Sequence, residues 1–192
     1  MAKSLAKHLD QVLQVYRRAG FNVRTILMDG EFEKLKNILQ TVECNTTAAM
    51  EHVSKVECSI RTVKERTWGL IGRLPFDNIP QRMKIKLVYF IVLWLSAFPV
   101  KTGVSSIYSP RELLVRWRLD YKKHCRVLPG TYCKVHDEPL PSNTMVPRTH
   151  KGIALGPRGN LQGTVKFYCL NTGRVLKRHS FMSLPMPNSV IQ

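Results

Sequence analysis

Hydrophobic residues recur at helical spacing at the start of the chain and then give way to short apolar runs. The repeat over residues 5–16 predicts an amphipathic helix that ends at Gly20. Residues 23–28 form a mostly apolar run with a single charge, which predicts an interior strand. The pattern then predicts a turn at Asp29-Gly30, a short helix over residues 31–39, a second strand over residues 41–44 and a polar segment at residues 45–47.

Two further helices follow. A stripe that starts with Val56, Ile60 and Val63 and continues to Leu74 predicts a long helix that ends at Pro75. Pro80 opens a second, more apolar helix that runs to about Ala97, and we expect it to be buried on most faces. Its most apolar stretch, residues 87–100, is shorter than the roughly 20 residues that span a bilayer.

The pattern of hydrophobic and polar residues changes in the second half of the chain. Residues 99–110 read as a connector and residues 111–117 as a short helix. From Pro129 on, short alternating runs such as residues 131–136 and 165–170 are separated by turn residues, which is typical of strands. The expected plan is α/β over residues 1–98, a linker with a short helix over residues 99–128, and a small all-β module over residues 129–192.

Composition adds a preference for anionic partners. The 192 residues carry a formal charge of +17, and 44% of them are hydrophobic, which excludes a wholly disordered basic tail. Residues 101–192 alone hold 15 basic and 4 acidic side chains. This surplus favours a nucleic acid or an anionic membrane surface as partner. Five cysteines without framework spacing and no apolar leader favour a reducing compartment, the nucleus or the cytoplasm.

Two acidic residues hold positions that suit metal chemistry. Asp29 follows the end of a predicted strand, where open α/β sheets bind ligands, and Glu57 begins the long helix. If the two converge, they offer oxygen ligands to Mg²⁺ or Mn²⁺. Arg61 and Lys64 lie on the same shoulder of that helix as Glu57 and would then face phosphates. The alternative is that Asp29 only caps a turn and that Glu57 only favours a helix start.

Several segments in colinear order resemble one family. These segments are ILMDGEFEKL, EHVSKVECSIRTVKERT, SPRELLV, TYCKVHDEPLP and RTHKGIALGPRGNLQGTVKFYCLNTGRVLKRHSF. They resemble the integrase of copia-type long-terminal-repeat retrotransposons, from the C-terminal half of the catalytic core onward. The resemblance implies an RNase H-like core, an SH3-like β-barrel module, and a D,D-E triad that binds two metal ions for DNA integration. By the same resemblance, Asp29 matches the second aspartate and Glu57 the glutamate.

The sequence departs from this family in two ways. The first strand of the family's core and its aspartate have no counterpart here, and the loop before the glutamate is short, at residues 45–54. We therefore expect an incomplete catalytic site in a fragment of a transposable element, with a second copy or a fuller integrase chain needed for chemistry. DNA is the expected partner, and no membrane is expected.

A basic segment near the end of the chain is the second candidate site. Arg174, Lys177 and Arg178 are interleaved with aromatic residues, a pattern that suits phosphate contacts and base stacking. The alternative is a solvated strand face. A different class of function also stays open, namely a host-adopted, non-catalytic module that binds nucleic acid or protein through residues 129–192.

A zinc site is the weakest candidate. His124, Cys125, Cys133 and His136 include a CxxH step, but the paired spacing of a zinc finger is missing. The expected outcome is a buried strand cysteine and surface histidines.

Overall fold

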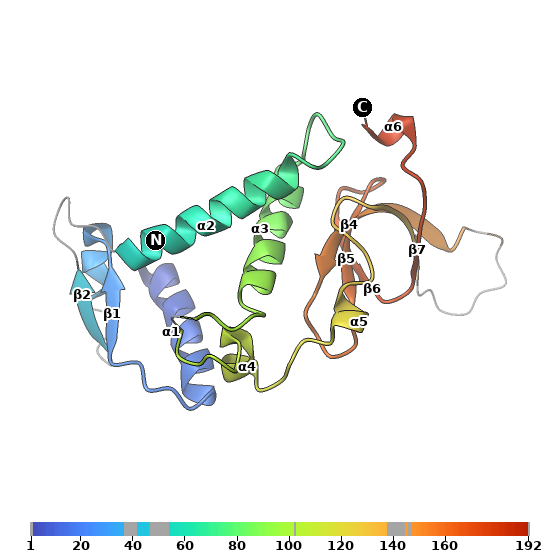
Figure 1. Ribbon diagram of the computed structural model, residues 1–192. Coiled ribbons are helices and arrows are strands. Elements are labelled where there is room, and N and C mark those ends of the chain that lie inside the picture. Colours follow the sequence, from blue (N-terminus) through green and yellow to red (C-terminus); the bar gives the residue numbers. More distant parts are fainter. Residues whose placement is uncertain are drawn as a thin grey trace. The chain divides into compact units, whose positions relative to one another are not determined.

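The computed structural model describes residues 2–36, 42–46, 54–101, 103–137, 145 and 147–191 (Figure 1). The architecture is mixed α/β, as the sequence predicted: helices accompany a two-stranded sheet and a five-stranded antiparallel sheet. The chain divides into two compact units, a first unit of Met1–Thr62 with Phe98–Trp117 and a second unit of Val63–Ala97 with Arg118–Gln192. The domain limits predicted from the sequence, at residues 98 and 129, divide the chain differently from these two units. They stay a prediction.

The first unit begins with helix α1 (Ala2–Arg18), which ends as predicted beside Gly20, whose φ is +87°. Strands β1 (Thr25–Met28) and β2 (Glu43–Thr46) pair in parallel. The expectation that the first strand is interior is wrong. Among the described residues β1 pairs with β2 alone, and Leu27 in its middle is 56% exposed.

Two predicted boundaries in this unit are corrected. The segment after β1 is the 3₁₀ helix η1 (Gly30–Leu35), so the expected helix stops early; residues 37–39 of that prediction and Thr41 lie outside the described residues. Strand β2 runs through Asn45 and Thr46, which the polar pattern assigned to a loop. Pairing with Leu27 and Met28 explains the difference, because it gives polar residues a regular backbone partner. Most of the short loop at residues 45–54 also lies outside the described residues.

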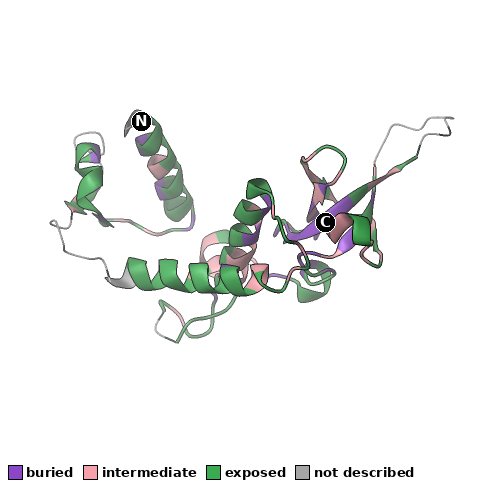
Figure 2. Cartoon of the chain, turned by 90° about the horizontal axis from the view of Figure 1, so that it is seen from above, coloured by how far each residue is buried: buried purple, intermediate pink, exposed green. Residues whose placement is uncertain are grey.

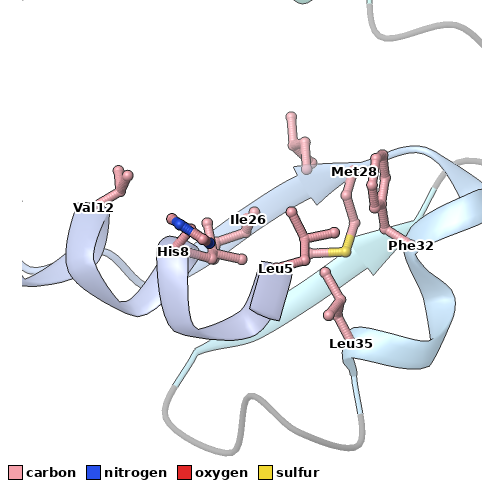
Figure 3. Close-up of a pocket in the computed structure, with 9 residues that line it drawn as sticks. Leu5, His8, Val12, Ile26, Met28, Phe32 and Leu35 are labelled. Carbon is pink, nitrogen blue, oxygen red and sulfur yellow. The ribbon is translucent and has the colours of Figure 1, made fainter. Parts of the chain in front are cut away.

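The core of the first unit is small. Ala6, Met28 and Leu35 are buried, and Leu9, Ile26 and Cys44 pack against them. Beside this core lies an open apolar groove of about 350 Å³, shown in Figure 3. The apolar groove is lined by residues of α1, β1 and η1: Leu5, His8, Leu9, Val12, Ile26, Leu27, Met28, Phe32 and Leu35.

Helix α2 (Ser54–Ile71) confirms the predicted long helix, but its apolar stripe is covered over only part of its length. Val56 and Ile60 are about half exposed. Leu70 and Ile71, at the other end, pack against the core of the second unit. Figure 2 shows this helix as exposed along most of its length.

Helix α3 (Gln81–Leu95) begins after Pro80 as predicted but is not buried on most faces. Met83 and Leu87 are buried in a core they share with Ile153 and Leu155 of the sheet. A second stripe stays more than a third exposed: Ile85, Val88, Tyr89, Val92 and Leu95. One face therefore packs, because the sheet meets the helix from one side. No helix in the described parts of the chain has the length and apolarity needed to cross a membrane.

The remaining short helices are α4 (Pro110–Val115) in the first unit, and α5 (Tyr121–His124) and α6 (Asn188–Ile191) in the second. The all-β pattern over residues 129–192 did not predict α6. Helix α4 matches the short helix predicted over residues 111–117.

The second unit is built on an antiparallel sheet. Its strands are β3 (Tyr132–His136), β4 (Thr149–Pro157), β5 (Val165–Cys169), β6 (Val175–Arg178) and β7 (Phe181–Ser183), in the order β6-β5-β4-β3-β7. Strands β3 and β5 confirm two predicted runs. Among the described residues the sheet is open rather than closed into a barrel.

Both faces of this sheet are packed. One face holds Cys133, Val135 and Phe167, with Phe181 against them. The other face holds Tyr132, Ile153 and Leu155 against α3. In Figure 2 the buried colour is concentrated on these strands.

Candidate nucleic-acid interface

A basic cleft lies in the second unit between α3 and the β5–β6 hairpin. Its volume is about 470 Å³. Five of its lining residues are cationic and two are apolar: Arg82, Ile85, Lys86, Lys166, Arg174, Val175 and Lys177.

The strand register explains why two of these cations meet. Lys166 on β5 stands directly opposite Lys177 on β6. Side chains alternate along a strand, so Lys166 shares the face of Tyr168, which packs toward α3. Phe167, between them, points into the core on the opposite face.

The helix contributes the other half of the cleft. Arg82 and Lys86 are four residues apart and lie on the same side of α3. The Arg82 Nη1 donates a hydrogen bond of 3.3 Å to the carbonyl oxygen of Gly173, in the turn between β5 and β6. This contact ties the first turn of α3 to the hairpin that carries Arg174 and Lys177.

The cleft concentrates unbalanced positive charge. Burial lowers the pKa of Lys166, and the positive charges of Lys86, Lys177 and Arg158 lower it further. Among the residues that the structure describes, those that line the cleft include no carboxylate. Within the described parts of the chain, none of the five cations takes part in an ion pair. An anion bound here would relieve repulsion between like charges.

The three basic residues predicted from the sequence are not kept together. Arg174 and Lys177 line the basic cleft, whereas Arg178 lies on the opposite face of β6, opposite Val165. Its Nη2 donates to Asp137 Oδ1 at 2.9 Å, and His150 Nε2 lies 3.0 Å from Asp137 Oδ2. These hydrogen bonds, Arg178 first and His150 second, lower the pKa of Asp137.

Sequence reasoning missed three of the cleft cations. Lys166 lies within an apolar run, and a lysine at such a position indicates a strand that has one polar face. Arg82 and Lys86 carry the weaker signal of two cations one helical turn apart. Neither signal shows that helix and hairpin meet, because that depends on tertiary packing.

The acidic pair predicted from the sequence lies in the first unit. Asp29 is exposed directly after β1, and its Oδ1 accepts a 2.7 Å hydrogen bond from the backbone N–H of Gly30, which starts η1. Glu57, Arg61 and Lys64 are exposed along α2. In the parts of the chain that the structure describes, no group of three or more histidine, cysteine or acidic side chains is placed to hold a metal ion. Asp29 and Glu57 stay predicted ligands of Mg²⁺ or Mn²⁺.

Two residues of the zinc candidate, Cys133 and His124, are buried and contribute to packing and hydrogen bonding. Cys133 is fully buried in the sheet core, as expected. His124 is not on the surface as expected but only 2% exposed. Its Nδ1 lies 2.7 Å from the carbonyl oxygen of Asp120 and its Nε2 2.9 Å from that of Asn160, so whichever ring nitrogen carries the proton can donate to a backbone carbonyl.

Comparison with known proteins assigns no family. No protein-family model matches the chain, and a search of curated proteins finds no significant match. The geometry of the basic cleft therefore carries the functional argument.

Proposed function

We propose that this chain binds DNA through the basic cleft of the second unit. The observation that carries the proposal is the convergence of five cations from α3, β5 and the β5–β6 hairpin on one cleft, with no carboxylate among its described lining residues. Solvated surface lysines are usually dispersed among acidic residues. Here a partly buried lysine, Lys166, is held among other cations, which costs free energy unless an anion binds.

A phosphate backbone fits this cleft better than a small anion. Cations on two separate elements suit several phosphates in a row, and the charge of +17 extends the attraction beyond the cleft. Binding of this kind is mostly independent of sequence and releases counterions, so its affinity falls as salt rises.

The copia-type integrase resemblance gives this activity a context. The proposal includes an RNase H-like origin for residues 1–98 and an SH3-like origin for the β-module of residues 129–192. A parallel β1–β2 pair with Asp29 at the end of β1, and a long helix that carries Glu57 in its first turn, support the former. In this proposal the chain derives from an integrase of this type, works in the nucleus or cytoplasm, and binds DNA.

The test compares two double variants that remove the same charge. Lys166→Gln/Lys177→Gln removes the opposed lysines of the cleft. Lys134→Gln/Lys151→Gln removes another directly opposed and exposed lysine pair of the same sheet, outside the cleft lining. Fluorescence anisotropy with labelled DNA, over a range of salt concentrations, measures the affinity and the slope of log K against log salt.

The cleft variant is expected to lower affinity at least tenfold at low salt. It should also reduce the salt slope by about 1 for each phosphate that the substituted side chains no longer neutralise. The control variant should change affinity much less. Equal losses of affinity in both variants would mean that overall charge, not the cleft, binds DNA. Affinity that does not change with salt would also refute the proposal.

A further inference from the structure

An exposed aromatic ring adjoins the basic cleft. Tyr89 lies on α3 one helical turn after Ile85, which lines the cleft. Its side chain is 59% exposed, although a tyrosine on a helix packed against a sheet could have been buried. The Nζ of Lys86, itself a cleft residue, lies 5.3 Å from the centre of the Tyr89 ring. The ring thus lies beside the cations of the cleft, with Lys86 over one of its faces, and more than half of the residue stays exposed.

Apolar side chains next to Tyr89 enlarge the exposed apolar surface beside the cleft. Val88 and Val92, its neighbours on α3, are also more than a third exposed, and Ile85 continues the strip into the cleft. A duplex presents phosphates on its outside but keeps its base faces stacked inside. A single strand presents phosphates and base faces together. A cationic groove bordered by an exposed aromatic ring is complementary to the single strand.

We infer that the basic cleft prefers single-stranded DNA, with the phosphates on its cations and one base stacked on Tyr89. This inference rests on the proposed function, since it specifies the form of DNA that the same cleft holds. Tyr89 supplies a base contact rather than a phosphate contact, so its contribution should be largely independent of salt.

The experiment uses the full chain and two fluorescent probes, an oligothymidylate of about 12 nucleotides and a blunt duplex of the same length. Tyr89→Leu is expected to weaken binding of the single strand about tenfold, because one base stack contributes about 1–3 kcal/mol. Duplex binding should change less than twofold. Tyr89→Trp should retain single-strand affinity, since it keeps a stacking surface.

Tyr108→Leu is the matched control, because Tyr108 is exposed to a similar extent, 57%, and does not line the cleft. It should leave both affinities unchanged. Equal affinity of the native chain for the two probes would overturn the inference, as would a Tyr89→Leu variant that binds the single strand normally. Either result leaves the lysine variants as a separate test of DNA binding, so the two failures can be told apart.

Discussion

The two units differ in how far their sheets are covered. The five-stranded sheet of the second unit is packed on both faces, and Phe167 and Leu155 are at most 1% exposed. The two-stranded sheet of the first unit has Leu27 more than half exposed and the open apolar groove beside it. Isolated two-stranded sheets are marginally stable, whereas larger sheets with a packed face can fold by themselves. The basic cleft therefore lies on the better-packed unit, and the predicted Asp29/Glu57 pair lies on the less covered one.

The largest expected effect comes from the core of the second unit. Phe167→Ala removes a fully buried ring that contacts Phe181, with 5.0 Å between ring centres. It should lower the free energy of unfolding by about 3–5 kcal/mol, since it leaves a cavity in a packed core. Leu27→Ala, in the exposed part of β1, should cost less than about 1 kcal/mol. Urea unfolding followed by circular dichroism measures both.

A similar cost for the two substitutions would contradict the comparison, because it would mean that Leu27 is as well covered as Phe167. Phe167→Leu serves as the milder core variant if the alanine variant does not fold, and it should still destabilise more than Leu27→Ala.

An intermediate effect is expected at Ser109, a buried polar residue of the first unit. Ser109 is 1% exposed and caps α4. Its Oγ accepts from the Glu112 backbone N–H at 3.2 Å, and its own backbone N–H donates to Glu112 Oε2 at 2.8 Å. Ser109→Ala should cost about 1 kcal/mol in the same assay, whereas exposed Ser106→Ala should cost almost nothing. If Ser109→Ala left the free energy of unfolding unchanged, the capping contacts of Ser109 would add no stability to the first unit.

The smallest effect concerns pH. Asp137 has a lowered pKa in the folded chain because Arg178 and His150 hydrogen-bond to its carboxylate. Its contribution to stability is therefore present above the unfolded pKa of about 4 and is lost as pH falls through the lower folded pKa. Asp137→Asn should flatten the dependence of the urea midpoint on pH below about pH 4. An unchanged acid profile in this variant would show that the Arg178 and His150 contacts do not stabilise the sheet.

The sequence predicted the elements well and their burial poorly. Periodicity located α1, α2, β3 and β5, because each carries its own apolar pattern. It could not show that only one side of α3 meets the sheet, so a helix expected to be buried on most faces leaves Tyr89 and Val92 exposed. The polar residues Asn45 and Thr46 read as loop, since their strand conformation comes from pairing with β1 and not from their own preference.

The sequence could predict only those cations of the candidate site that are near one another in the chain. Lys177 and Arg178 are neighbours, yet strand alternation sends one to the basic cleft and the other to Asp137. Arg82 and Lys166 are far apart in sequence, so their meeting depends on how α3 packs on the sheet. Patterns of residue type carry no direct information on such long-range contacts.

The contact between α3 and Gly156 limits where the chain can be truncated for recombinant expression. Gly156 has a φ of +102°, and a Cβ atom there would lie 2.3 Å from Cδ2 of Phe90 on α3. The ring of Phe90 lies directly against this glycine, so a side chain at position 156 would have to displace the ring. A recombinant piece cut at residue 129, where the strand pattern starts, would leave out this helix, uncover Leu155 and Ile153 and lack Arg82 and Lys86. Expression of the C-terminal half should therefore retain α3, because a piece without this helix exposes apolar residues of the sheet and lacks two of the five cations of the basic cleft.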